Sequence, residues 1–157
     1  MQVTVRSTIS IICLMMTLSA CGSYSPVQRG SGYTPAAGEK AAETAVAMIG
    51  RPYKYTGETP SGFDCSGLVR YSYLTAGVDL PHGTSALKNM TRTIGFGSAR
   101  RGDLVFFVQE GKKYSHVGIY IGGSKFVHAP SSGKTVRKDS LTDPYWKKHH
   151  LDTRRFI

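Results

Sequence analysis

The most constraining feature of this chain is a change in hydrophobic period at Gly102. Before it, apolar residues recur at helical spacing, which predicts helices over 39–49, 65–76 and 84–90. After it, short β-branched and aromatic runs alternate with glycine-bearing turns, which predicts strands over 103–108, 115–121, 125–129 and 151–157. Helices followed by strands is the order of an α+β fold, with N-terminal helices packed on an antiparallel β-sheet. We therefore expect a single domain over residues 39–157.

Residues 1–20 have the features of a secretory signal, with one charge at Arg6, an apolar run over 9–18 and a small-residue exit. The run is too short to span a bilayer. Its exit, Leu-Ser-Ala followed by Cys21, resembles the bacterial lipoprotein signal, in which this cysteine becomes the lipidated first residue. An ordinary cleaved signal with a chance cysteine is the alternative. Residues 21–38 are rich in Gly, Ser and Pro and are expected to form the lipidated N-terminus and a flexible tether.

The cysteines point to one reactive thiol. If Cys13 leaves with the signal and Cys21 is acylated, Cys65 is the remaining thiol of the mature chain. An unpaired thiol in an oxidising compartment is exposed to oxidation, so a chemical role competes with a buried structural one. Gly22 stands where an aspartate retains lipoproteins at the inner membrane. We therefore expect a bacterial cell-envelope protein, anchored by lipid to the outer membrane and facing the periplasm.

The charge narrows the class of partner. The formal net charge is +10, and this excess favours an anionic partner. The basic residues are scattered or paired and form no long basic arm. Anionic wall polymers and lipid headgroups are therefore favoured, and nucleic acid is not an expected partner. We expect a monomer that needs no cofactor and no metal.

Cys65 is predicted to lie in the first turn of its helix, directly after the capping residue Asp64. The unpaired N–H groups and the positive dipole end at this position favour a thiolate over a thiol. Gly67 lies inside the same helix, where glycine costs up to about 1 kcal/mol relative to alanine. Such a glycine indicates a close approach by another backbone or by a substrate. Together these features favour a reactive cysteine over a structural one.

Two histidines lie on the predicted strands that follow. His116 and Gly118 share one face of the strand over 115–121. A two-residue turn to the next strand would place His128 on the opposite face. A three-residue loop over 122–124 instead places His128 opposite the glycine and diagonal to His116. The second arrangement brings the two imidazoles together, with space left by the glycine.

Five segments in order cover nearly all of the chain after the tether: Pro52-Tyr53-Lys54-Tyr55, Asp64-Cys65-Ser66-Gly67-Leu68-Val69, Gly102-Asp103-Leu104-Val105-Phe106-Phe107, His116-Val117-Gly118-Ile119-Tyr120-Ile121-Gly122 and Val127-His128-Ala129. They resemble the NlpC-type cell-wall peptidases, which are papain-like cysteine hydrolases of bacterial envelopes. The resemblance implies a papain-like fold and the hydrolysis of peptide bonds in peptidoglycan. Each segment is moderately specific, and the set in order is highly specific.

The resemblance also implies roles for individual residues. Cys65 matches the nucleophile, His116 the base, and His128 the third polar residue that orients the base. A thiol attacks the amide carbonyl and the base serves the leaving amine and then water. Tyr53 matches the active-site tyrosine that helps to stabilise the oxyanion. The backbone N–H of the nucleophilic cysteine is the expected second oxyanion donor.

Two matches and three departures concern substrate binding. Asp64 and Ser66 match positions implicated in binding the substrate. Thr56 stands where the family often has the first of two glycines, His82 where an arginine is usual, and Leu87 where a glutamine is common. The departures lie near the expected substrate groove, whereas the three catalytic positions are intact.

The favoured function is a murein endopeptidase, with cleavage of D,D cross-links preferred over cleavage after γ-D-glutamate. One alternative is acyl transfer, or thioester or ester hydrolysis, by the same Cys/His/His site. A second is a non-catalytic wall-binding lipoprotein. A third is a zinc site, for which the candidate ligands would be Cys65, His116, His128 and either His149 or His150. No CxxC or HExxH spacing supports the zinc site.

Overall fold

The computed structural model describes residues 32–157. The helices are α1 (Pro35–Ala47), α2 (Cys65–Thr75), α3 (Thr84–Asn89) and α4 (Pro144–His149), with one 3₁₀ turn, η1 (Phe96–Ser98). The strands are β1 (Glu58–Thr59), β2 (Gly62–Phe63), β3 (Thr91–Ile94), β4 (Leu104–Gln109), β5 (Lys112–Gly122), β6 (Lys125–His128), β7 (Arg137–Ser140) and β8 (His150–Phe156). The predicted signal segment and Cys21 lie outside the described residues.

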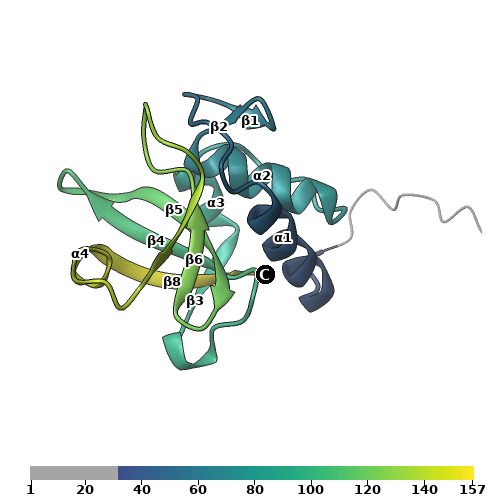
Figure 1. Cartoon of the computed structure of the whole chain (residues 1–157). Coiled ribbons are helices and arrows are strands. Elements are labelled where there is room, and N and C mark those ends of the chain that lie inside the picture. Colours follow the sequence, from purple (N-terminus) through teal and green to yellow (C-terminus); the bar gives the residue numbers. More distant parts are fainter. Residues whose placement is uncertain (1–31) are drawn as a thin grey trace, which may run out of the picture.

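Six of the strands form one antiparallel sheet in the order β3-β8-β4-β5-β6-β7, and β1 and β2 form a separate hairpin. Helices α1 and α2 lie side by side against one side of the large sheet, whereas α4 lies at its opposite side (Figure 1). The order of helices first and antiparallel strands afterwards confirms the predicted α+β class.

The sheet buries a different kind of core on each side. The helix-side core is large and mostly aliphatic, and its central members are Ala41, Ala45, Leu68, Val69, Leu104, Phe106, Val117 and Ile119. The far-side cluster is smaller and mostly aromatic, and its members are Val105, Phe107, Tyr120, Phe126, Leu141 and Trp146. Because successive side chains of a strand point to opposite faces, β4 and β5 supply both.

The first helix begins earlier than expected. The predicted helix over 39–49 is α1, which starts at Pro35 because the side chain of Thr34 caps it and accepts from the N–H of Ala37 at 3.1 Å. Proline suits the first helical position because its missing N–H would have no partner there. Tyr33, which precedes the cap, packs against the helix-side core. The predicted tether over 21–38 is therefore wrong at its end, since 33–38 belong to the folded domain.

Several elements follow the prediction closely and others were missed. Strands β4, β5, β6 and β8 overlap the four predicted runs, and α2 and α3 overlap the second and third predicted helices. The edge strands β3 and β7 and the helix α4 were not predicted. Their sequences, TRTI, RKDS and PYWKKH, carry no apolar alternation. Backbone pairing with a neighbouring strand holds both edge strands instead.

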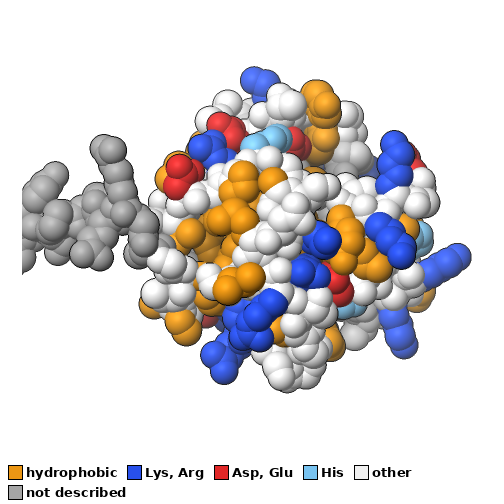
Figure 2. Space-filling model, turned by 180° about the vertical axis from the view of Figure 1, so that it is seen from behind, with side chains coloured by type: hydrophobic (Ala, Val, Ile, Leu, Met, Phe, Trp, Pro, Cys, Tyr) orange, Lys and Arg blue, Asp and Glu red, His pale blue; other side chains and the backbone are white. Residues whose placement is uncertain are grey.

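The distribution of positive charge on the surface agrees with the scattered basic residues of the sequence. Figure 2 shows lysine and arginine side chains distributed over the rear face rather than gathered in one patch. Within residues 32–157, no helix is both long enough and apolar enough to cross a membrane.

Candidate active site

Cys65 occupies the first position of α2, as predicted. Asp64 is the N-cap residue, and its Oδ1 accepts from the N–H of Gly67 at 2.7 Å. The backbone of Asp64 is extended and the chain turns into the helix at Cys65, so the side chain of the cysteine lies at the helix tip. The cysteine residue is partly buried.

The glycine inside α2 has the predicted cause. A Cβ on Gly67 would lie 1.9 Å from the carbonyl oxygen of Gly57, so only glycine lets the preceding loop approach the helix. The same carbonyl accepts from the N–H of Asp64 at 2.9 Å, which ties the loop to the helix start. Thr56, one of the departures from the family pattern, has a φ of 55°. Glycine adopts this left-handed conformation without strain, whereas a β-branched residue does not.

The two histidines share a face of the sheet, although the turn differs from the predicted loop. Gly122 pairs with Lys125, so the turn has two residues, Gly123 and Ser124, both with positive φ. A β-bulge at Ile121 then inserts one extra residue before Tyr120 pairs with Phe126. Beyond the bulge the register is the predicted one, in which His128 lies opposite Gly118.

The imidazoles are joined by a hydrogen bond between Nε2 of His116 and Nδ1 of His128, 2.8 Å apart. Both side chains are buried, with His116 2% and His128 0% exposed. Trp146 of α4 stacks on His116 with centroids 5.8 Å apart and meets His128 edge-on at 4.8 Å. A Cβ on Gly118 would lie 2.6 Å from Phe126, so this glycine keeps the space beside the rings. The predicted convergence of the two histidines is confirmed.

Cys65 and His116 open into the same cavity. Its volume is about 270 Å³, and its wall includes Tyr53, Ser115, Ala129 and Pro130 in addition to these two residues. The backbone of Val117, the residue after His116, hydrogen-bonds to the thiol of Cys65. The sulfur therefore lies beside β5, at the residue that follows His116.

The protonation states of this pair differ from the predicted thiolate. Burial, and after it the nearby carboxylate of Asp64, raise the pKa of the Cys65 thiol to about 11, although backbone hydrogen bonds at Val117 and Ser66 act in the opposite direction. Burial, together with the neighbouring His128, lowers the pKa of His116 to about 3. Burial thus outweighs the favourable helix end, and both pKa shifts favour a neutral thiol next to a neutral imidazole in the free protein.

Tyr53 lies next to the cysteine, as the family pattern implied. Its backbone N–H donates to Lys134 O at 2.8 Å, and it pairs with Phe63 through an isolated bridge. Burial raises the pKa of its phenol, and the thiol of Cys65 raises it further, so the hydroxyl stays protonated and can donate a hydrogen bond.

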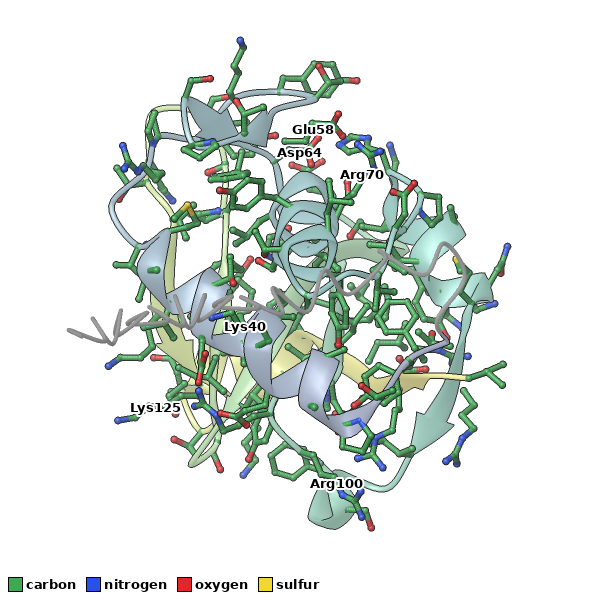
Figure 3. All side chains as sticks on the ribbon, turned by 90° about the vertical axis from the view of Figure 1, so that its right-hand side faces the viewer. Lys40, Glu58, Asp64, Arg70, Arg100 and Lys125 are labelled. Carbon is green, nitrogen blue, oxygen red and sulfur yellow. The ribbon has the colours of Figure 1, made fainter. Side chains whose placement is uncertain are left out.

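Asp64 and Ser66 are buried and bonded to one another, with Ser66 Oγ donating to Asp64 Oδ1 at 3.0 Å. The half-exposed imidazole of His82 completes the group, with Nε2 3.0 Å from Asp64 Oδ2. Figure 3 shows Asp64 near one end of α2, close to Glu58 and Arg70. Arg70 binds Glu58 at 2.7 Å and the carbonyl of Leu80 at 2.8 Å, which fixes the loop that carries His82.

One residue of the site was missed in the sequence. Asp139 of β7 lies behind His128, with Oδ2 2.9 Å from Nε2 of that ring. The strand β7 was not predicted, so nothing placed this carboxylate near the histidines. Across residues 32–157, no three histidine, cysteine, aspartate or glutamate side chains are grouped as possible metal ligands.

Comparisons with known proteins agree with this geometry. Residues 50–155 match the NlpC/P60 family. The chain is 36% identical over 115 residues to the murein DD-endopeptidase MepH of Escherichia coli (strain K12), across 70% of this chain and 42% of that protein. It is 39% identical over 114 residues to the bifunctional muramidase/DL-endopeptidase CwlT of Bacillus subtilis (strain 168), across 71% of this chain and 34% of that protein.

Among solved structures, the NlpC/p60 domain of the peptidoglycan hydrolase SagA is similar, with a TM-score of 0.64 and 36% identity. The match covers 76% of this chain and 98% of that domain. The match thus spans less than half the length of each of the two curated relatives and nearly all of the isolated domain. The chain belongs to the NlpC/P60 family and has its papain-like α+β fold, which confirms the expected family and fold class.

Proposed function

We propose that this chain is a thiol endopeptidase that hydrolyses peptide bonds in peptidoglycan. The observation that carries the proposal is that Cys65, at a helix tip, and His116, on a strand, line one cavity, while His128 of the neighbouring strand is hydrogen-bonded to His116 at 2.8 Å. The names of the relatives support the choice of substrate, since MepH and CwlT are named as endopeptidases of murein or of DL bonds. The excess of positive charge suits a substrate with free carboxylates.

In this proposal Cys65 is the nucleophile and His116 is the base. The thiol loses its proton to the neutral imidazole as sulfur attacks the amide carbonyl, because both groups are neutral beforehand. The imidazolium then gives that proton to the leaving amine and the peptide amine departs. Water attacks the resulting thioester and gives a proton back to His116, which releases the acid product and restores the thiol.

His128 holds the ring of His116 while these steps occur. Its Nδ1 faces Nε2 of His116, so the other ring nitrogen of His116 is left for the thiol. In papain-like sites an amide or carboxylate takes this place, and its role is to fix the orientation and tautomer of the base.

Oxyanion stabilisation is assigned to two donors. The backbone N–H of Cys65 belongs to the first turn of α2, where N–H groups have no partner within the helix. Tyr53 lines the same cavity and keeps its phenolic proton, so its hydroxyl is the second donor. Loss of one such donor typically lowers the rate by about 10²–10³-fold.

Substrate binding is assigned to Asp64 and Ser66, which flank Cys65 in sequence. Asp64 presents a carboxylate beside the nucleophile, and this carboxylate can accept from an amine or amide N–H of a stem peptide. His82 already contacts the same carboxylate at 3.0 Å and remains half exposed. A substrate that reaches Asp64 therefore also meets this imidazole.

The bond that we favour is the D,D cross-link rather than the bond after γ-D-glutamate. MepH supports the first choice by its name and CwlT the second, so the relatives divide. Mass spectrometry of muropeptides released from purified sacculi distinguishes the two, because a D,D cleavage separates cross-linked stems and a D,L cleavage shortens them.

We also propose that the chain is anchored through a lipid on Cys21 to the outer membrane, facing the periplasm. The Leu-Ser-Ala-Cys exit supports this proposal. Acyl chains contribute about 0.8 kcal/mol per buried CH₂, so several chains hold a protein at a membrane stably. Cys21→Ala should release the protein from the membrane fraction, and continued sedimentation with membranes would contradict the anchor.

The central test is the Cys65→Ser variant of the full chain on purified sacculi. We expect loss of muropeptide release with an unchanged circular dichroism spectrum, because the hydroxyl is a far weaker nucleophile than the thiol. Turnover equal to the parent chain would contradict the proposed enzyme. Sacculus binding without turnover by the parent chain would instead favour a wall-binding protein.

A further inference from the structure

The second ring nitrogen of His128 leads to a residue outside the family triad. Nε2 of His128 lies 2.9 Å from Oδ2 of Asp139. The same oxygen accepts from Nε of Arg137 and from the indole N–H of Trp146, both at 2.9 Å. Three side chains therefore contact one carboxylate oxygen of Asp139, on the side of His128 that faces away from His116.

The carboxylate is ionised. Burial alone raises the pKa of Asp139, but hydrogen bonds from His128 and Arg137, together with the charge of the arginine, bring it below its ordinary value. An ionised carboxylate accepts hydrogen bonds and donates none. The hydrogen in the bond to His128 must therefore belong to Nε2 of the imidazole.

The hydrogen on Nε2 of His128 determines where the other hydrogens lie between Asp139, His128 and His116. Burial lowers the pKa of His128 to about 4, so the ring is neutral near pH 7 and carries one N–H. With that hydrogen on Nε2, Nδ1 of His128 is an acceptor. The 2.8 Å contact then requires Nε2 of His116 to donate, which leaves Nδ1 of a neutral His116 without a hydrogen.

We propose that Asp139 is a positioning residue that sets the tautomer of both histidines, so that His116 presents a bare Nδ1 to the thiol. The inference rests on the proposed function for its consequence, but the tautomers themselves do not depend on it. When the thiol proton moves to Nδ1, His116 becomes an imidazolium whose Nε2–H still donates to His128. Its positive charge is then balanced through the neutral His128 ring by the carboxylate, and no second proton has to move.

Without the carboxylate the opposite arrangement becomes available. His128 can then carry its hydrogen on Nδ1 and donate it to Nε2 of His116. His116 in turn carries its hydrogen on Nδ1, where it faces the sulfur and can no longer accept a proton. A structural role for Asp139 in holding β7 and α4 would predict a loss of stability but no such exchange of hydrogens.

The test is nitrogen NMR of the full chain in detergent, labelled with ¹⁵N-histidine, at a pH above 7. Two-bond proton–nitrogen spectra report which ring nitrogen carries the hydrogen. We expect Nε2–H on both buried rings in the parent chain and in Asp139→Asn, whose amide oxygen still accepts. We expect a mixture with Nδ1–H in Asp139→Ala. Retention of Nε2–H alone on both rings in the alanine variant would overturn the inference.

The rate of sacculus hydrolysis by the Asp139 variants is a second test of the proposal. We expect kcat to fall about 10²-fold in Asp139→Ala and about tenfold in Asp139→Asn, which keeps the acceptor but loses the charge, with KM unchanged in both. If the alanine variant does not fold, the asparagine variant decides, and a kcat within twofold of the parent would overturn the role of the charge. Absence of turnover in the parent chain would contradict the proposed function, whereas the NMR result would still decide the tautomers.

The matched control is Asp143→Asn. Asp143 caps α4 by accepting from the N–H of Tyr145 at 2.9 Å, and asparagine is an equally good cap. This change removes a carboxylate four positions from Asp139 while α4 is retained. We expect the parent tautomers and the parent kcat, and a change in either would mean that general charge loss, and not Asp139, controls the rings.

Discussion

The two faces of the sheet are both buried, but they are held by different interactions. The helix-side core consists mainly of aliphatic groups and alanines, and its free energy comes from the area removed from water, with little dependence on orientation. The far-side cluster surrounds two histidines with aromatic rings, and directional hydrogen bonds run through it to Asp139. The helix side supplies stability and the cysteine, whereas the far side supplies orientation.

The largest expected effect comes from the helix-side core. Phe106 is fully buried there, and Phe106→Ala should lower the free energy of unfolding by about 3–5 kcal/mol, because the change removes apolar contacts and leaves a cavity. Urea unfolding monitored by circular dichroism measures it. Leu74→Ala is the control, since Leu74 lies on α2 but is 50% exposed, and we expect a loss of less than about 1 kcal/mol. Equal losses in the two variants would break the comparison.

The far-side cluster should instead make the free energy of unfolding depend on pH. His116 and His128 have lowered pKa values in the fold, about 3 and about 4, so the unfolded chain binds more protons below pH 6.5. Stability from these rings is present above that pH and is lost as the pH falls towards 4. Between pH 6 and 5 we expect the free energy of unfolding to drop by about 2–3 kcal/mol.

Unfolding curves of the parent chain and of His128→Asn measure this dependence. The asparagine variant lacks one of the two buried imidazoles, so its slope between pH 6 and 5 should be about half that of the parent. A flat parent profile over this range would show that the buried rings do not resist protonation, and the distinction between the two faces would fail.

Trp146 sharpens the comparison within the far-side cluster. Trp146→Phe keeps an aromatic ring but removes the indole N–H that donates to Asp139 at 2.9 Å. Because that hydrogen bond has a charged acceptor, we expect Trp146→Phe to lower the free energy of unfolding by about 1.5–3 kcal/mol. Thermal unfolding measures it, and Tyr145→Phe, one position away at a half-exposed site, serves as the control. A loss no larger than that of the control would mean that packing alone accounts for this cluster.

The smallest effect should come from a position outside both faces. Thr56 has a φ of 55°, and Thr56→Gly relieves that strain while losing the hydrogen bond from Thr56 Oγ1 to Tyr55 O. We expect a net gain in the free energy of unfolding of up to about 1 kcal/mol. Thr59→Gly, in the neighbouring strand β1, should show no such gain. A lower free energy of unfolding in Thr56→Gly would mean that the threonine hydrogen bond contributes more than the backbone strain costs.

Much of the site could be predicted because its residues lie in strongly patterned segments. The cap at Asp64, the helix that begins at Cys65 and the shared face of His116 and His128 follow from local spacing and side-chain alternation. One packing contact could also be predicted, since Gly67 inside α2 indicated the close approach of another backbone, which is the loop at Gly57.

The missing parts lack a local signal. Strand β7 has mostly charged residues that are exposed or partly exposed, and its backbone pairing with β6 holds it in place, so no periodicity marks Asp139. Pairing of His128 with Arg137 in that register makes Asp139 the diagonal neighbour of His128, a relation visible only once the strand is known. The predicted thiolate failed for a similar reason, since burial of Cys65 depends on the assembled fold.

The extra residue at Ile121 has a consequence for how this segment tolerates changes in length. Side chains of a strand alternate between faces, so a shift of register by one residue would turn His128 away from His116. Removal of Ile121 avoids this shift, because Gly122 would still pair with Lys125, and Tyr120, now its direct neighbour, would still pair with Phe126. The bulge therefore lets this hairpin lose one residue, at Ile121, while the base and its partner stay on the same face of the sheet.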